Sequence, residues 1–388
     1  MAAQTLRGAP RLREARGSGR LPKYPARRWA RWALRLGFAL PFLALALLLD
    51  ANDDGYFSGE TANAELLAEV RGVGAGEVGI DVLGALYPPI SSLIALLVPG
   101  GALGLGIVGS LVAGFFCQRV FEWFTRRRVP RLDGSILLLL IAGTPLTAFL
   151  VTTNLEMTLG AVLFGLGMID LIRFIVYANT QAGFRVGLYF ATAALSAPAF
   201  IFSILLAGCV APLLYHSRLG SRIANALVLV FPTVAAFGSA SLLGLVFRSD
   251  PLLPLRNTGF DPADDRLQAT LDVLGSSWGW LHFVPTVLSM LLALAAQRPL
   301  IALAPPLITA SFLLMSATGV SPVGSSGTSF LILATVVAAI CAQRLRDWHR
   351  VAALTLVVLQ ALVGWALSFL LYPSVGQWWR ALTGGALG

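Results

Sequence analysis

The segment "LGFALPFLALALLLDANDDGYFSGE" (residues 36–60) passes without a break from an apolar run into a dense group of acidic and amide side chains. Trp29, Trp32 and Arg35 precede the run, and such side chains anchor and extend a helix at a membrane interface. No small-residue cleavage motif of a signal peptide fits before Asp50 without cutting into the run itself. The segment therefore predicts an uncleaved membrane helix over 33–49, followed by an acidic loop.

The composition of the whole chain is that of a membrane protein. Its 388 residues are 57% hydrophobic and 12% charged, with a mean hydropathy of +0.78, whereas soluble domains carry about 25% charged residues. Apolar runs close to membrane-spanning length recur throughout. We predict an all-α polytopic membrane protein with eleven transmembrane helices, near 33–49, 101–123, 135–152, 155–173, 186–197, 199–215, 223–247, 278–297, 299–316, 327–342 and 351–371. The break at Ser196-Ala197-Pro198 divides 186–215 into two of these helices.

The basic residues predict the orientation of these helices. With the N-terminus in the cytoplasm, 23 of the 28 Lys and Arg residues lie on the cytoplasmic side and 5 on the outer side, which is a strong positive-inside bias. This bias accounts for the net charge of +9 without a nucleic-acid partner. We predict a disordered cytoplasmic tail over 1–32, a transmembrane domain over 33–371 and a short outer tail over 372–388, so that the C-terminus is outside.

The same topology places two long loops, 50–100 and 248–277, on the outer side. In the first, Ser58 is a suitable N-cap, Ala62, Leu66 and Val70 recur at helical spacing, and Gly72 is a suitable end. We therefore predict a helix near 59–71 that lies in the membrane plane. Pro88 and Pro89 interrupt the later apolar stretch, which we interpret as a short helix on the same side.

Few other side chains suggest chemistry. Cys117, Cys209 and Cys341 lie in apolar runs and form no disulfide pattern, and no Cys or His cluster has metal-ligand spacing. Asp170 precedes Arg173 by one helical turn, which predicts an ion pair. We interpret His282 as an interfacial side chain and "QWWRALTGGALG" (377–388) as an interfacial aromatic belt.

The order of these features resembles a known family. "NDDGYFSGE" (52–60), "YPPI" (87–90) and "TTNLEMTLGAVLFGLGM" (152–168) resemble motifs of the GT-C superfamily of polyprenyl-phosphate-sugar-dependent glycosyltransferases, such as protein O-mannosyltransferases and aminoarabinose transferases. The resemblance covers about residues 30–215. The chain departs from the family at Tyr87, where a Lys or His is common.

The resemblance implies an inverting glycosyltransferase in a bacterial cytoplasmic membrane. It would transfer a sugar from a polyprenyl-phosphate lipid to an acceptor on the outer side. Asp53 would be the base, and Asp54 would orient the acceptor or bind a divalent cation. The further substrate-binding residues implied are Glu60, Tyr87 and Glu156, together with Arg256 and Arg266 for the donor phosphate.

Three other interpretations stay open from the residues. The acidic cluster is also what an ordinary polar loop at a helix end contains. A non-catalytic membrane subunit with a degenerate GT-C-like fold would keep the same order of features. A transporter or flippase of a lipid-linked saccharide is the third alternative, although the predicted spans hold almost no midplane charge and no internal repeat.

Overall fold

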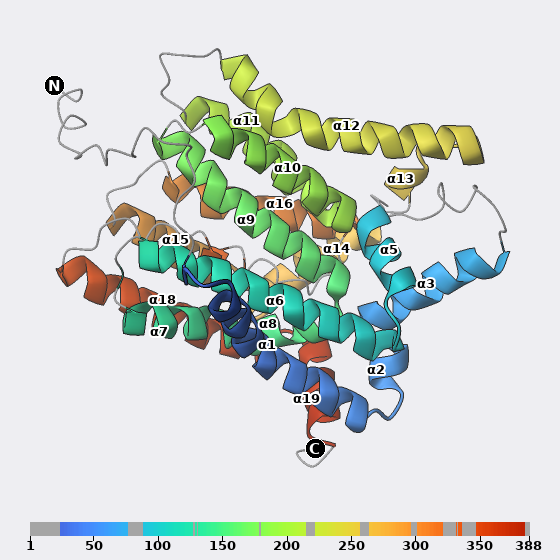
Figure 1. The fold of residues 1–388 in the computed structure, drawn as a ribbon, viewed down its shortest axis with the longest axis horizontal. Helices are drawn as coiled ribbons and strands as arrows, with labels where there is room; N and C mark the ends of the chain where they lie inside the picture. The colour runs from blue at the N-terminus through green and yellow to red at the C-terminus, as the bar shows by residue number, and fades with distance from the viewer. Residues whose placement is uncertain are drawn as a thin grey trace.

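The protein is a bundle of helices (Figure 1). The computed structural model describes residues 24–76, 88–126, 129, 131–177, 180–214, 222–256, 264–295, 301–320, 331, 333–335 and 347–384. Within these residues there is no β-strand. The all-α class predicted from the composition is therefore confirmed for this part of the chain.

Four single helices are long and apolar enough to cross a membrane: α1 (Arg28–Ala51), α6 (Gly101–Arg126), α9 (Leu155–Tyr177) and α12 (Arg222–Arg248). Three bent helix pairs have the composition of a broken span. They are α7 (Arg131–Ala142) with α8 (Pro145–Thr153), α14 (Asp264–Gly275) with η2 (Gly279–Phe283) and α15 (Val284–Ala295), and α18 (Asp347–Leu370) with α19 (Pro373–Leu382). Their bends are 67°, 95° and 89°, respectively. The described residues thus contain four candidate spans, or up to seven if each bent pair is one span.

The prediction of eleven spans is not confirmed, because several predicted spans form short helices. The segment 180–214 is divided into α10 (Thr180–Ser196), η1 (Pro198–Phe200) and α11 (Ile201–Leu214), as the break at Pro198 predicted. Helix α16 (Ala304–Ala317), preceded by η3 (Ile301–Leu303), has 14 residues. At about 1.5 Å per residue, such helices are shorter than the apolar core of a bilayer, which is about 30 Å thick. Most of the span predicted at 327–342 lies outside the described residues.

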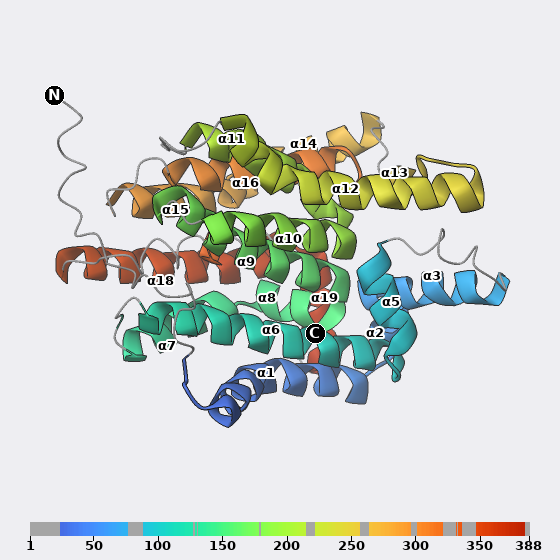
Figure 2. The ribbon, with the colours of Figure 1, turned by 45° about the horizontal axis from the view of Figure 1, so that its top comes forward.

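Close helix contacts form the centre of the bundle. Helix α1 packs along α6, and a Cβ atom on Gly114 of α6 would lie only 2.5 Å from the backbone oxygen of Arg35. Helices α9 and α10 lie side by side (Figure 2). Between them, the buried rings of Phe164 and Phe190 stack with their centroids 5.2 Å apart. Small residues thus allow backbones to approach, and aromatic rings fill the wider spaces.

The apolar surface of α12 is mostly exposed. Only 11% of its most apolar 18-residue stretch is buried inside the protein. Its exposed side chains include Leu227, Phe231 and Val234. Helix α12 lies on one face of the bundle, against α10 and α11 (Figure 2). An exposed apolar face of this extent is what a lipid-facing helix presents.

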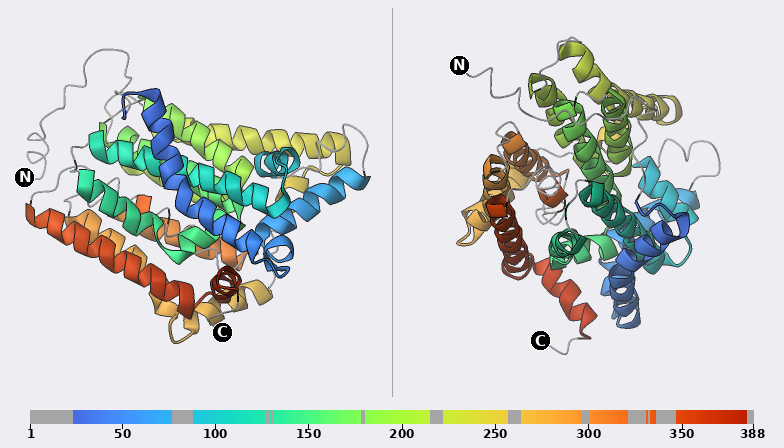
Figure 3. Two further views of the ribbon diagram at one scale, coloured as in Figure 1. Left: turned by 60° about the horizontal axis from the view of Figure 1, so that its bottom comes forward. Right: turned by 60° about the vertical axis from the view of Figure 1, so that its left-hand side comes forward.

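Short helices gather at one end of the bundle: α2 (Tyr56–Gly59), α3 (Ala62–Gly76) and α5 (Pro89–Leu97) (Figure 3). We call it the Asp53 end, because the Asp53 carboxylate accepts backbone N–H groups of α2. The predicted helix near 59–71 corresponds to α3, but its predicted boundaries are wrong. Ser58 lies inside α2, and the Thr61 hydroxyl instead accepts the Ala64 N–H at 3.4 Å, in the capping position. Helix α3 also continues past Gly72 to Gly76. In the second predicted loop, α13 (Leu253–Arg256) and α14 form.

Candidate functional site

The acidic turn after α1 is organised around the Asp53 carboxylate. Its Oδ1 accepts the backbone N–H groups of Gly55 and Phe57, both at 2.9 Å, and its Oδ2 accepts that of Ser58 at 3.1 Å. Gly55 has a φ of 105°, a conformation that favours glycine. Asp53 therefore caps α2 and holds the chain in a tight turn at the end of the first long helix.

The same contacts keep Asp53 ionised. Desolvation opposes ionisation, but hydrogen bonds from the Ser58 hydroxyl and from the backbone N–H groups of Gly55, Phe57 and Ser58 outweigh it and lower the pKa of Asp53. A carboxylate with a lowered pKa carries its negative charge at neutral pH. It is thus present in the form that a base requires, but it is intrinsically weaker as a base than an ordinary aspartate.

Asp54 follows Asp53 in the chain, Glu60 follows α2, and both are exposed. Asp54 accepts the Tyr56 N–H at 3.4 Å, a long hydrogen bond. Burial of the Tyr56 hydroxyl, with a smaller effect of the Glu60 charge, raises the pKa of Tyr56 to about 12. The Tyr56 hydroxyl donates to the backbone oxygen of Ser374 on α19 at 3.5 Å. Tyr56 thus connects the acidic turn to the C-terminal helix.

Glu156 lies in the first turn of α9, where Asn154 caps the helix by accepting the Met157 N–H at 2.9 Å. Its carboxylate is half-buried and lies close enough to Glu69 of α3 for the two negative charges to repel each other. Among the described residues, the Glu156 side chain has no hydrogen-bond or ion-pair partner. Partial desolvation raises the pKa of Glu69. Glu69 was not predicted as a site residue, although it lies one turn after Glu65 in the helix predicted near 59–71.

Asn63 connects the part of the chain that holds Asp53 to the start of α9, which holds Glu156. Its amide donates to the backbone oxygen of Thr152 at 3.2 Å, and its side-chain oxygen accepts the Leu155 N–H at 2.7 Å. The short segment between α8 and α9 is therefore fixed to α3. Because α3 also packs on α2, Asp53 and Glu156 belong to one connected end of the bundle.

The other predicted site residues are not seen to join this cluster. Arg266 is exposed on α14, which packs against α16 and η2. Arg256 is the last residue of α13, which packs against α12, and its side chain lies outside the described part. Tyr87 also lies outside the described residues. Phosphate binding by Arg256 and Arg266 and substrate binding by Tyr87 stay predictions.

A resident metal ion has no evident ligand set in the described part of the chain. No group of three or more His, Cys, Asp or Glu side chains there has the geometry to hold one. Most metal sites need at least three protein ligands, although Mg²⁺ is often held by one or two carboxylates and its substrate. The predicted role of Asp54 as a metal ligand is therefore untested.

Contacts of the C-terminal helix α19, and of Tyr372 just before it, also shape this end. Trp378 is buried and donates its indole N–H to the Thr152 hydroxyl at 3.1 Å. The interpretation of this part of the tail as an interfacial belt is therefore wrong for Trp378, because α19 folds back onto α8. His282, interpreted as interfacial, has its Nδ1 2.9 Å from the Tyr372 hydroxyl.

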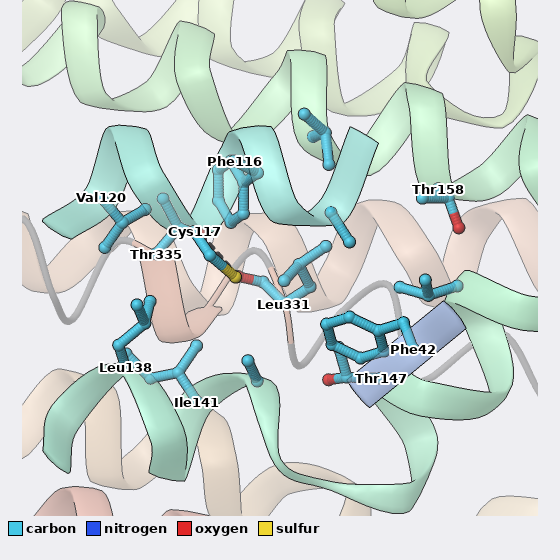
Figure 4. A pocket seen from close by; sticks show the side chains of 14 residues that line it. Phe42, Phe116, Cys117, Val120, Leu138, Ile141, Thr147, Thr158, Leu331 and Thr335 are labelled. Atoms are coloured by element: carbon cyan, nitrogen blue, oxygen red, sulfur yellow. Dashed lines mark hydrogen bonds between the residues drawn. The ribbon is translucent and has the colours of Figure 1, made fainter. Parts of the chain in front are cut away.

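A small cavity lies deeper in the bundle, between α1, α6, α7, α8 and α9 (Figure 4). Its volume is about 10 Å³, and its lining is apolar apart from Cys117, Thr147, Thr158 and Thr335. A cavity of about 10–15 Å³ holds a single water molecule. It is too small for a sugar or a lipid headgroup and is not a substrate site.

Comparison of the chain with protein-family models, with curated proteins and with solved structures finds no significant match.

Proposed function

We propose that the protein is a GT-C-like membrane glycosyltransferase that transfers a sugar from a polyprenyl-phosphate donor to an acceptor at the Asp53 end. The observation that supports this function best is the acidic turn itself. An ionised carboxylate, Asp53, is held by three backbone N–H groups directly after an apolar helix of membrane-spanning length. Short helices lie over the same end and leave the neighbouring Asp54 and Glu60 exposed.

In this proposal Asp53 is the base. A carboxylate has about four lone-pair positions, and three of those on Asp53 accept backbone N–H groups. The remaining position receives the Ser58 hydroxyl, which can rotate away when an acceptor hydroxyl binds. As that hydroxyl attacks the anomeric carbon, its proton passes to Asp53, and the bond to the lipid phosphate breaks. One such displacement inverts the anomeric centre.

The remaining roles follow the family resemblance. Asp54 orients the acceptor or binds a divalent cation, and Glu60 and Glu156 support the site. Tyr87 is a further substrate-binding residue, and Arg256 and Arg266 balance the charge of the departing phosphate. The Lys and Arg distribution supports a cytoplasmic N-terminus and an outer Asp53 end. The membrane of this proposal is the bacterial cytoplasmic membrane.

A non-catalytic GT-C-like membrane subunit is the second candidate, and one observation favours it. The Asp53 carboxylate is already used to cap α2. A turn that exists only to start a short helix would have the same hydrogen bonds. Capping alone therefore does not distinguish a base from a structural carboxylate.

The Asp53→Asn substitution separates the two candidates. Asparagine keeps the oxygen that accepts Gly55 and Phe57 but loses the one that accepts Ser58, and it cannot take a proton. Transfer of labelled sugar from polyprenyl phosphate is measured in membranes of a deletion strain complemented with each variant at equal protein level. Asp250→Asn is the matched control, because Asp250 accepts the Leu252 N–H at 2.9 Å in a similar turn.

The catalytic proposal expects transfer by the wild type and by Asp250→Asn, with a large loss in Asp53→Asn. Wild-type transfer by Asp53→Asn would remove this residue from the mechanism. No transfer by the wild type with a panel of polyprenyl-phosphate sugars would favour the non-catalytic subunit.

A further inference from the structure

A second polar cluster lies at the opposite end of the bundle, which we call the Arg173 end: Arg35, Arg119, Arg173 and Arg185 with Glu122 and Asp170. A cavity of about 40 Å³ opens there between α6, α9 and α10. Its lining contains Arg119, Glu122, Trp123, Asp170, Arg173 and Tyr189, with Leu166 and Ile169. None of these residues belongs to the site proposed above.

The two acidic residues of this cavity already have partners. The Asp170 carboxylate forms ion pairs with Arg173 through Oδ1 at 2.8 Å and with Arg185 through Oδ2 at 3.1 Å. The predicted ion pair between Asp170 and Arg173 is therefore confirmed. Glu122 accepts the Tyr24 N–H through Oε1 at 3.2 Å, and Arg119 through Oε2 at 2.8 Å. The Gln118 amide donates to the same Oε2 at 3.4 Å. All four carboxylate oxygens therefore accept hydrogen bonds from the protein.

The arginines, in contrast, have donors left over. A guanidinium has five N–H donors, and the contacts above use one donor each of Arg119 and Arg173. The Arg173 side chain is only 10% exposed and stacks over the Trp123 ring at 5.7 Å. Its remaining N–H groups have little access to bulk water. The cavity therefore offers donors and positive charge, which an acceptor-rich anion satisfies.

The position of the cavity indicates the source of such an anion. Arg119 and Arg173 lie near the last turns of α6 and α9, the ends of two apolar helices of spanning length. This is the depth at which lipid headgroups meet the protein. Arg35 stacks on the exposed Trp32 at 4.6 Å on the neighbouring α1, a combination typical of a membrane interface.

We propose that the Arg173 end binds the phosphodiester headgroup of an anionic phospholipid, held by Arg119 and Arg173. The phosphate oxygens accept the spare guanidinium donors in bidentate geometry, and the acyl chains lie along the apolar surface outside the bundle. The bound lipid joins α6 to α9 and α10 at this end. The site is independent of the sugar chemistry proposed for the Asp53 end.

The test uses the full chain in detergent and measures lipid binding by native mass spectrometry. The protein is titrated with phosphatidylglycerol and with phosphatidylcholine of the same acyl chains. We expect the wild type to prefer phosphatidylglycerol. Arg119→Gln should weaken that binding about tenfold, the loss expected for one charge-assisted hydrogen bond. Arg28→Gln is the matched control and should bind as the wild type does, because Arg28 is exposed near the same end but does not line the cavity.

A second variant, Arg173→Lys, keeps the positive charge beside Asp170 but loses the planar pair of donors. It should fold and still bind phosphatidylglycerol more weakly than the wild type. Size-exclusion elution checks folding, and if this variant does not fold, Arg119→Gln decides alone because its side chain is 35% exposed.

Equal wild-type binding of the two lipids would overturn the proposal. The same holds if Arg28→Gln loses as much affinity as Arg119→Gln. If the protein binds inorganic phosphate but shows no preference between the two lipids, the site belongs to a free anion. That result would also overturn the lipid assignment.

Discussion

Asn63 of α3 and Leu155 at the start of α9 are joined by a hydrogen bond of 2.7 Å from the Leu155 N–H to the Asn63 side-chain oxygen. The Leu155 N–H is one of the first in its helix and has no partner within it. A residue 92 positions earlier therefore completes the beginning of α9. The acidic segment after α1 is thus a structural part of the bundle as well as a surface for chemistry.

Replacing Asn63 tests this connection. Asn63→Ala leaves the buried Leu155 N–H and the Thr152 oxygen without their side-chain partner, which costs about 1–3 kcal/mol for each unsatisfied group. Thermal unfolding in detergent should show a clearly lower midpoint. Asn154→Ala, which removes the cap from Met157, is the comparison and should cost about 1 kcal/mol. Equal midpoints for Asn63→Ala and the wild type would show that the bond contributes nothing.

Acid should weaken the Asp53 turn. The pKa of Asp53 is lowered in the folded protein, because hydrogen bonds to the carboxylate outweigh desolvation. The stability that its charge contributes is therefore complete above the unfolded pKa of about 4 and is lost as the pH falls below it. Hydrogen exchange at Phe57 and Ser58 should rise, relative to the intrinsic rate, between pH 4 and pH 3. Asp53→Asn should abolish this dependence, and Asp54→Asn should keep it.

The role of Asp54 can be separated from that of Asp53. Asp54 is exposed and makes one long hydrogen bond, so Asp54→Asn should leave the fold intact. If Asp54 orients the acceptor, sugar transfer should fall by less than the 10²- to 10⁴-fold typical of a lost base. If it binds a divalent cation, a chelator should reduce wild-type transfer to the level of Asp54→Asn, and excess Mg²⁺ should restore it. If neither Asp54→Asn nor the chelator reduces sugar transfer, Asp54 neither orients the acceptor nor binds a required cation.

Glu69 should destabilise the fold at neutral pH. Its pKa is raised by desolvation, so the folded state favours the protonated carboxyl, and stability falls as the pH rises above about 4.5. Glu69→Gln removes this effect and the repulsion of Glu156. We expect a slightly higher unfolding midpoint at pH 7, and no difference at pH 4. Glu65→Gln, an exposed neighbour on α3, is the control and should change neither value.

Cysteine labelling tests the predicted orientation. The exposed positions Glu65 on α3 and Arg28 on α1 lie at opposite ends of the bundle. In a background without Cys209 and Cys341, Glu65→Cys should react with a membrane-impermeant maleimide in intact cells. Arg28→Cys should react only after permeabilisation, because the N-terminus is predicted to be cytoplasmic. The reverse pattern would invert the topology.

The sequence predicted the features that depend on neighbouring residues. Continuous apolar runs predicted the long helices α1, α6, α9 and α12, and Pro198 predicted the break after α10. The spacing of Asp170 and Arg173 predicted their ion pair. Each of these features follows from helix geometry or from a backbone restriction that acts within a few residues.

Features that depend on distant contacts were missed. The helix predicted from Ser58 begins after Thr61 instead, because Asp53 draws residues 56–59 into a separate turn of helix. The burial of Trp378 depends on α19 folding back to Thr152, 226 positions away. The approach of Glu69 to Glu156 likewise depends on how α3 packs. Local patterns in the chain contain no information on such pairs.

The bend between α7 and α8 has a consequence for how the protein is made. At about 1.5 Å per residue, α7 and α8 measure roughly 18 and 14 Å, and neither alone crosses an apolar layer of about 30 Å. The break between them also leaves backbone groups that lipid cannot satisfy. If the pair forms one span, neighbouring helices must shield its break from lipid. Helices α6 and α9 contact the pair and can do so. We therefore expect insertion of this segment to be cooperative with its neighbours, among them α9, a helix synthesised after it.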